Sequence, residues 1–158
     1  MQKLIDGFHK FHAEVFGARR DFFETLRDIC GSVSGPVSAE VVAQDYETML
    51  AEGHKLRTVA DNIVVKLPST IDGLKACKAL SDEKIKTNMT LCFQPLQALM
   101  VAKAGAFLVS PFIGRLDDIG EVGMDLINRT RQIYDNYGYK TKILAASVRH
   151  STHMLECA

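Results

Sequence analysis

Short runs rich in β-branched and apolar residues recur along the chain, and they alternate with segments whose apolar residues have helical spacing. Several runs, such as Asn62–Leu67 (NIVVKL), are too apolar for either face of a strand to lie in water. Strands buried on both faces and separated by helices form a parallel sheet that helices cover. The sequence therefore predicts an α/β fold.

Five runs predict strands in this sheet. They are Pro36–Val42, Asn62–Leu67, Thr87–Phe93, Phe107–Phe112 and Lys142–Val148. Helical stripes are expected within Leu4–Phe16, Phe22–Ile29, Tyr46–Leu56, Leu74–Ser81, Pro95–Met100 and Leu126–Gly138. A closed barrel and an open doubly wound sheet both satisfy this alternation. No Gly-x-Gly-x-x-Gly or Walker-type loop follows a strand, which weakens the nucleotide-binding, open-sheet alternative.

Composition narrows the range of partners. Nineteen basic residues balance nineteen acidic ones, so no electrostatic reason exists to expect nucleic acid or an anionic membrane surface. The most hydrophobic region, Met89–Phe112, is interrupted by Gln94, Pro95, Gln97 and Lys103, which argues against a membrane span. The four cysteines form no Cys-x-x-Cys pair and lie in apolar stretches. Buried, reduced thiols in a cytoplasmic protein are the expectation.

Polar residues interrupt the predicted strands in pairs. The pairs are Ser38 with Glu40, Asn88 with Thr90, Ser110 with Phe112, and Ser147 with Arg149. Residues two apart on a strand point to the same face of the sheet. Each pair lies late in its strand, so the pairs would converge at the carboxyl-terminal mouth of a barrel, where barrel enzymes have their active sites.

Lys66 directly follows the apolar run Ile63–Val65. In a strand buried on both faces, desolvation disfavours the charged ammonium. A neutral lysine amine is a nucleophile toward carbonyl groups, which is what a Schiff-base enzyme requires. A lysine that snorkels to solvent from the strand end, next to Pro68, explains the pattern equally well.

Glu40 also has two interpretations. It could form an ion pair with a basic neighbour such as Lys66, or perform acid–base work through a water that Thr90 also holds. Arg115 and Arg149 follow strands at positions suited to phosphate binding. Ser147 would add a hydroxyl donor there. A salt bridge from Arg115 to one of the aspartates at 117 and 118 is the competing interpretation.

Histidines give a weaker signal. His9 and His12, like His150 and His153, have the i, i+3 spacing that two metal ligands on a helix can share. The sequence indicates no third ligand for either pair. We therefore expect surface or partly buried histidines and no metal.

Several longer stretches resemble the small transaldolases, a group that includes the fructose 6-phosphate aldolases. They are GPVSAEV (35–41), DNIVVKLPST (61–70), KTNMTLCFQPLQALMVAKAGAFLVSPFIGRLDDIG (86–120), YDNYG (134–138) and KILAASVRH (142–150). The resemblance implies a (β/α)8 TIM barrel and a reaction through a lysine imine without a cofactor. About five of the eight βα units would lie in residues 1–158, as one partial barrel domain.

The resemblance also implies roles for particular residues. Lys66 would form the imine, Glu40 and Thr90 would hold the catalytic water, Asn88 and Ser110 would contact the substrate hydroxyls or the imine, and Arg115, Ser147 and Arg149 would bind the phosphate. The implied substrates are phosphorylated ketoses and aldoses, between which a dihydroxyacetone unit is transferred. Small members of the family form rings of barrels, so a homo-oligomer is expected.

Two alternatives remain open. The first is a lyase of the fructose 6-phosphate aldolase type, and the second is an inactive fragment that acts as an assembly or interaction protein. The aldolase branch has glutamine where Glu40 stands and tyrosine where Phe112 stands, so this pair of residues favours the transferase.

The sequence departs from the family pattern at both ends. The family has a catalytic aspartate on its first strand and a Thr-Asn-Pro motif after its second. Here Leu4–Ile5 align with the residues that follow that motif, and only Met1–Lys3 come before them. Met154–Ala158 resembles the middle of the family's seventh helix. We therefore expect the chain to lack the first two strands and the last strand of the barrel.

Overall fold

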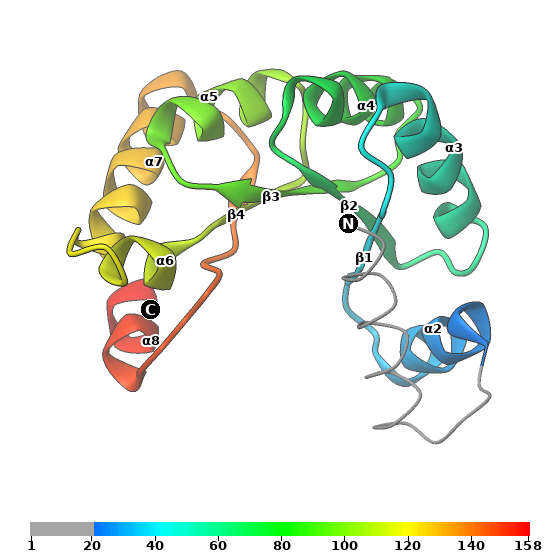
Figure 1. Ribbon diagram of the computed structural model, residues 1–158, viewed down its shortest axis with the longest axis horizontal. Coiled ribbons are helices and arrows are strands. Elements are labelled where there is room, and N and C mark those ends of the chain that lie inside the picture. Colours follow the sequence, from blue (N-terminus) through cyan, green and yellow to red (C-terminus); the bar gives the residue numbers. More distant parts are fainter. Residues whose placement is uncertain (1–20) are drawn as a thin grey trace.

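The computed structural model describes residues 21–158 and shows one sheet of five parallel strands (Figure 1). The strands lie side by side in chain order, and each neighbouring pair is parallel. Their bounds are β1 Val37–Glu40, β2 Ile63–Pro68, β3 Thr87–Cys92, β4 Leu108–Pro111 and β5 Lys142–Ile143. All five predicted strands are therefore confirmed.

Helices alternate with the strands as predicted. Their bounds are α2 Phe22–Ser32, α3 Tyr46–Arg57, α4 Ile71–Asp82, α5 Pro95–Lys103, α6 Ile113–Asp117, α7 Gly123–Tyr137 and α8 Ser151–Cys157. Pro95 occupies the first turn of α5, behind a capping box formed by Gln94 and Gln97. Gly138 ends α7 with a left-handed φ of 68°. The predicted stripe at Leu4–Phe16 and the pair His9 and His12 lie outside the described residues.

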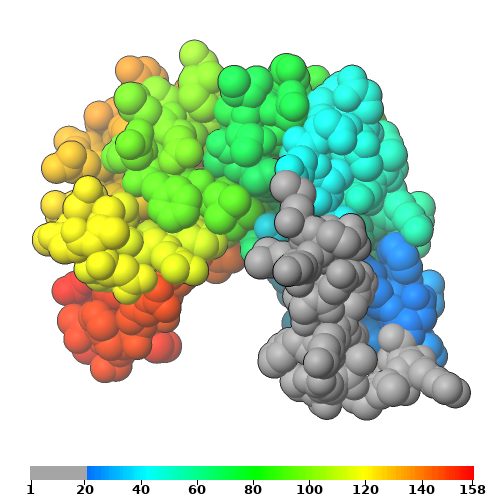
Figure 2. Space-filling model, viewed as in Figure 1, coloured from blue at the N-terminus to red at the C-terminus, as the bar shows by residue number. Residues whose placement is uncertain are grey.

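The sheet is curved, and this curvature decides between the two architectures that the sequence allowed. Helices α3, α4, α5 and α7 follow the outside of the arc, whereas the inner face looks into the hollow of a crescent (Figures 1 and 2). A doubly wound sheet would have helices on both faces. The described residues therefore form part of a (β/α)8 barrel, with β1 and β5 as the two edges of the sheet.

The core lies between the outer face of the sheet and the helices. Alternate residues of β2, Val65 and Leu67 among them, are fully buried in this core. Tyr134 is also fully buried, and its hydroxyl donates to the Ala98 carbonyl over 2.8 Å. Burial raises the pKa of Tyr134 and raises that of the Cys92 thiol to about 11. The core beneath β3 is therefore closed to solvent at these residues.

Two details differ from the sequence predictions. The fifth strand is much shorter than expected: its regular pairing ends at Ile143, and beyond it an isolated bridge joins Ala146 to Phe112. The carbonyls of Ala146 and Ser147 accept the backbone N–H groups of Ile113 and Gly114, at the start of α6. Three of the cysteines are buried as expected, but Cys157 is exposed. None of the described helices has the length and apolarity needed to span a bilayer.

The turn from β2 into α4 is unusually tight. Thr70 caps the helix by accepting the backbone N–H of Gly73 over 3.1 Å. A Cβ atom on Gly73 would overlap the carbonyl oxygen of Pro68. The absence of a side chain at position 73 therefore lets the helix begin directly behind the end of the strand that carries Lys66.

We expect Gly73→Ala to lower the free energy of unfolding by about 1–3 kcal/mol, the usual cost of forcing an atom into a packed site. The control is Gly31→Ala in α2, where an added Cβ has no atom within 4 Å. That change should be neutral or stabilising, since alanine is the better helix former. Chemical denaturation measures both, and equal effects would contradict the account of this turn.

Candidate active site

The parallel register sets three predicted site residues at one level across β1, β2 and β3. Lys66 is the register partner of Glu40 on one side and of Asn88 on the other. Side chains of register partners in a sheet point to the same face. Val65 and Leu67, which alternate with Lys66, belong to the core on the outer face, so the three polar residues face the hollow.

Lys66 and Glu40 form an ion pair across this face. The Lys66 Nζ atom donates to the Glu40 carboxylate over 2.7 Å. The Lys66 side chain is 27% exposed and that of Glu40 is 46% exposed. The expectation that Lys66 is buried on both faces was therefore wrong, because the inner face is partly exposed at Lys66 and Glu40, although Asn88 beside them is buried. The contact itself is the ion pair that the sequence offered as one interpretation of Glu40.

Asn88, on β3, is hydrogen-bonded to side chains on β4, which neighbours it, and on β1, which lies beyond β2. Its amide nitrogen donates to the Ser38 hydroxyl over 3.0 Å, and its carbonyl oxygen accepts the Ser110 hydroxyl over 2.8 Å. Both Asn88 and Ser110 are almost fully buried. A row of hydrogen-bonded polar groups therefore runs from β1 to β4 beside the Lys66 amine.

Thr90 follows Asn88 by two residues on β3, so both side chains are on the same face of the sheet. Its register partner on β2 is Pro68. Thr90 is 1% exposed, and its side-chain oxygen has no hydrogen-bond partner within the described part of the chain. Directly after it, Leu91 has a φ of 57° at an irregularity in the β3–β4 pairing. A buried hydroxyl without a partner costs about 1–3 kcal/mol, so this oxygen is suited to hold a small polar molecule.

The predicted phosphate residues gather where β4 and β5 end. The backbone N–H of Gly114 donates to the Ser147 carbonyl over 3.1 Å, which sets Arg115 next to the loop of Ser147 and Arg149. Arg149 is already paired, with its guanidinium on the Asp118 carboxylate at 2.8 Å. Arg115 is exposed and has no ion pair within residues 21–158, so its predicted competing salt bridge is absent there.

Phe112 lies between the two groups of residues. It forms an isolated bridge with Ala146, and its ring packs edge-on against Phe93 with 5.4 Å between the centroids. Phe93 directly follows β3, so this aromatic contact joins the ends of β3 and β4. The bridge to Ala146 therefore fixes the backbone of Phe112, and the contact with Phe93 fixes its half-buried ring.

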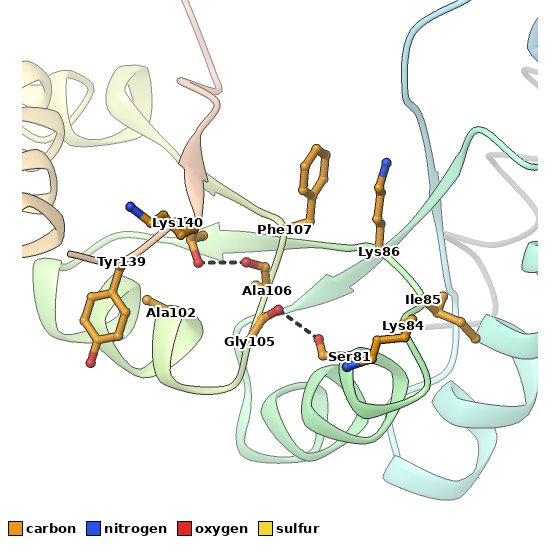
Figure 3. A pocket seen from close by; sticks show the side chains of 11 residues that line it. Ser81, Lys84, Ile85, Lys86, Ala102, Gly105, Ala106, Phe107, Tyr139 and Lys140 are labelled. Carbon is orange, nitrogen blue, oxygen red and sulfur yellow. Dashed lines mark hydrogen bonds between the residues drawn. The ribbon is translucent and has the colours of Figure 1, made fainter. Parts of the chain in front are cut away.

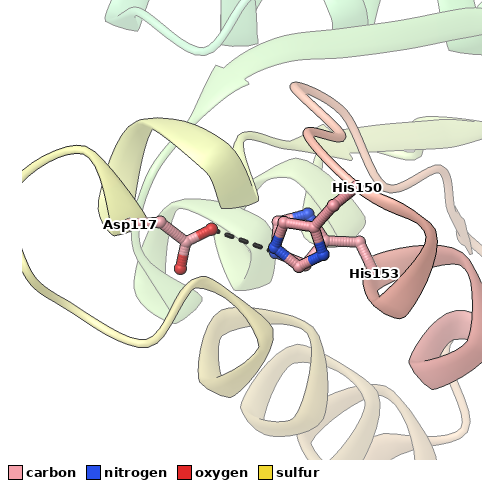
Figure 4. A group of neighbouring side chains, drawn as sticks. All are labelled: Asp117, His150 and His153. Atoms are coloured by element: carbon pink, nitrogen blue, oxygen red, sulfur yellow. Dashed lines mark ion pairs between the residues drawn. The ribbon is translucent and has the colours of Figure 1, made fainter.

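A cluster of Asp117, His150 and His153 stands at the same end (Figure 4). Their potential ligand atoms lie within 4.8 Å of one another, and His153 is 3% exposed. The sequence analysis was therefore wrong about His153, which is buried and has a third candidate ligand nearby. That ligand was missed because Asp117 and His153 are distant in the sequence.

One further depression lies at the other end of the strands (Figure 3), with a volume of about 420 Å³. Loops that precede β3, β4 and β5 supply most of its lining, which includes Lys84, Lys86, Phe107 and Lys140. None of the predicted site residues lines it. The polar residues that the sequence singled out instead gather on the inner face and at the carboxyl ends of the strands.

Known proteins are similar to this chain in sequence and in fold. The family model described as transaldolase/fructose-6-phosphate aldolase matches residues 7–158. Proteins named probable transaldolase from Erythrobacter litoralis and Caulobacter vibrioides are each 57% identical over 155 residues, and one from Bartonella bacilliformis is 54% identical. These alignments cover 98% of this chain and 71% of each relative.

The chain belongs to the transaldolase/fructose-6-phosphate aldolase family. A crystal structure from Coccidioides immitis, named as a fructose-1,6-biphosphate aldolase, matches with a TM-score of 0.56 at 15% identity. The match covers 84% of this chain and about half (52%) of that protein. At this sequence identity the match shows a similar fold and nothing about function. Family and fold together support a transaldolase or aldolase type of function.

We expect Asn88→Ala to lower the free energy of unfolding by about 1–3 kcal/mol, because the buried Ser110 hydroxyl loses its acceptor. Ser38→Ala, at the exposed end of the same row, is the matched control. It should cost less than about 1 kcal/mol, since water can replace the lost partner. Denaturant titration of both variants measures the difference, and a larger cost at Ser38 would contradict the described row.

Proposed function

We propose that this protein transfers a dihydroxyacetone unit between sugar phosphates through a Schiff base on Lys66. The observation that carries the proposal is the 2.7 Å contact of the Lys66 amine with Glu40, on the open face of the sheet and beside the Asn88 row. The family resemblance supplies the chemistry, and this contact supplies an amine with a proton acceptor at hydrogen-bond distance.

The first steps follow from this arrangement. The Lys66 ammonium gives a proton to Glu40, and the neutral amine adds to the ketone carbon of the ketose phosphate. Glu40 returns the proton to the carbinolamine hydroxyl, which leaves as water and gives an imine. The buried Thr90 hydroxyl has no hydrogen-bond partner within the described residues, so it is suited to hold this water. A preorganised pair of polar groups at this point lowers the barrier to dehydration.

In carbon–carbon cleavage the proton of the ketose hydroxyl passes to Glu40 through the water that Thr90 also holds, so the aldose phosphate leaves as an aldehyde and a three-carbon enamine stays on Lys66. The enamine adds to an acceptor aldehyde, and hydrolysis of the new imine frees the product ketose and the amine. Asn88 and Ser110 are the proposed groups for the hydroxyls of the three-carbon unit, because Asn88 is the register partner of Lys66 and accepts the Ser110 hydroxyl. Arg115, Ser147 and Arg149, at the ends of β4 and β5, are the proposed phosphate-binding groups.

Glu40 and Phe112 support the transferase over the lyase. The aldolase branch of the family, by resemblance, has glutamine and tyrosine at these positions. The phenylalanine ring has no hydroxyl to offer a water or a substrate, and it is fixed here against Phe93. A homo-oligomeric assembly and a cytoplasmic location, both implied by the resemblance, remain predictions.

Reduction with borohydride in the presence of fructose 6-phosphate should trap the three-carbon unit on Lys66. Peptide mapping by mass spectrometry locates the added mass, and Lys66→Met should abolish it. Lys75→Met is the control, because Lys75 lies in α4 and pairs with Asp72. An adduct on a different lysine, or none in the unchanged protein, would overturn the Schiff-base proposal.

Adding erythrose 4-phosphate separates the transferase from the alternatives. A transferase passes the trapped unit to this acceptor, so the yield of adduct falls and a new ketose phosphate forms. Release of free dihydroxyacetone without transfer would favour the lyase. An adduct that is neither transferred nor released would favour an inactive chain.

A further inference from the structure

The loop after β5 rests directly on α6. Two backbone hydrogen bonds hold it, from Ile113 N–H to the Ala146 carbonyl and from Gly114 N–H to the Ser147 carbonyl. A Cβ on Gly114 would overlap both that carbonyl oxygen and the side chain of Arg149. Ser147 itself has a left-handed φ of 61°, which is unfavourable for a residue with a side chain. A strained loop of this kind persists only when its surroundings hold it.

Asp117 supplies part of that support. One of its carboxylate oxygens accepts the backbone N–H of Gly123, at the start of α7, over 2.9 Å. The other pairs with the Nε2 atom of His153, in α8, at 3.0 Å. Asp117 itself lies in α6, directly before the residue that binds Arg149. This one carboxylate therefore ties three helices together at the end of the site.

His153 uses both of its ring nitrogens. The Nδ1 atom accepts the backbone N–H of Arg149 over 3.3 Å, so a neutral ring carries its proton on Nε2, which lies 3.0 Å from the Asp117 carboxylate. A metal ion on Nε2 would force the proton onto Nδ1, opposite another N–H. The cluster in Figure 4 is consequently better suited to hold the chain than to bind a metal.

We propose that His153 is a positioning residue for the phosphate end of the site. Together with Asp117 it locks the loop of Ser147 and Arg149 against the helix that carries Arg115. The buried ring reaches Arg149 through its backbone and α6 through Asp117, so it fixes the separation of the two arginine-bearing segments. The inference rests on the proposed function for the identity of the anion, a sugar phosphate.

The test measures phosphate recognition apart from imine formation. In His153→Ala, the dissociation constant of inorganic phosphate, by calorimetry, and the KM of fructose 6-phosphate should each rise about tenfold or more, as misplaced binding groups do. Borohydride trapping of unphosphorylated dihydroxyacetone on Lys66 should stay within about twofold of the unchanged protein, because that reaction needs no phosphate contact.

Matched variants separate positioning from general stability. Asp117→Asn keeps an acceptor for Gly123 but sets an amide against the His153 N–H, so it should weaken phosphate binding as His153→Ala does. His153→Asn keeps an acceptor near the Arg149 N–H and should recover part of the affinity. His150→Ala should change neither quantity, because His150 stacks on His153 at 3.8 Å without a hydrogen bond within the described residues.

The outcomes distinguish this inference from the proposed function. If unchanged protein binds no phosphate, or if His153→Ala weakens trapping as much as phosphate binding, the positioning role is wrong. If phosphate binding depends on His153 but Lys66 forms no adduct with either ketose, the Schiff-base proposal fails and the positioning role stands.

Discussion

The register in which β1, β2 and β3 pair is the constraint on which the rest of the site depends. Because Lys66 is the register partner of both Glu40 and Asn88, its amine contacts the Glu40 carboxylate, and Asn88 lies at the same level on the strand to the other side. A slip of β2 by one residue would turn Lys66 into the core. The tight start of α4 at Gly73 and the packed core beneath β3 hold β2 and β3 in place.

The second half of the site is built by loops rather than by strand pairing. Beyond Ile143 the chain keeps only an isolated bridge to the end of β4, and the carbonyls of Ala146 and Ser147 accept the first N–H groups of α6. That exchange is possible because position 114 is a glycine, which lets Ser147 and Arg149 approach the helix. Phe112 joins the halves, through its bridge to Ala146 and its ring contact with Phe93.

Runs of β-branched and apolar residues were enough to predict the strands, and the period of two in a strand set Asn88 and Thr90 on one face. Neither could show that this face is partly exposed at Lys66, so the burial of Lys66 was overestimated although its contact with Glu40 was anticipated. The pairing of Arg149 with Asp118 and of His153 with Asp117 joins residues more than thirty positions apart, which no local pattern reveals. The turn of the backbone at Leu91 also has no signal in the sequence, since leucine is not expected at a positive φ.

The most direct test of the account is a crystal structure of the protein after borohydride reduction with dihydroxyacetone. The account predicts a carbon–nitrogen bond to Lys66 Nζ, with hydroxyls of the three-carbon unit on Asn88 and Ser110 and an ordered water on the Thr90 oxygen. A unit that extends away from this row, or density on another lysine with Lys66 still paired to Glu40, would contradict it.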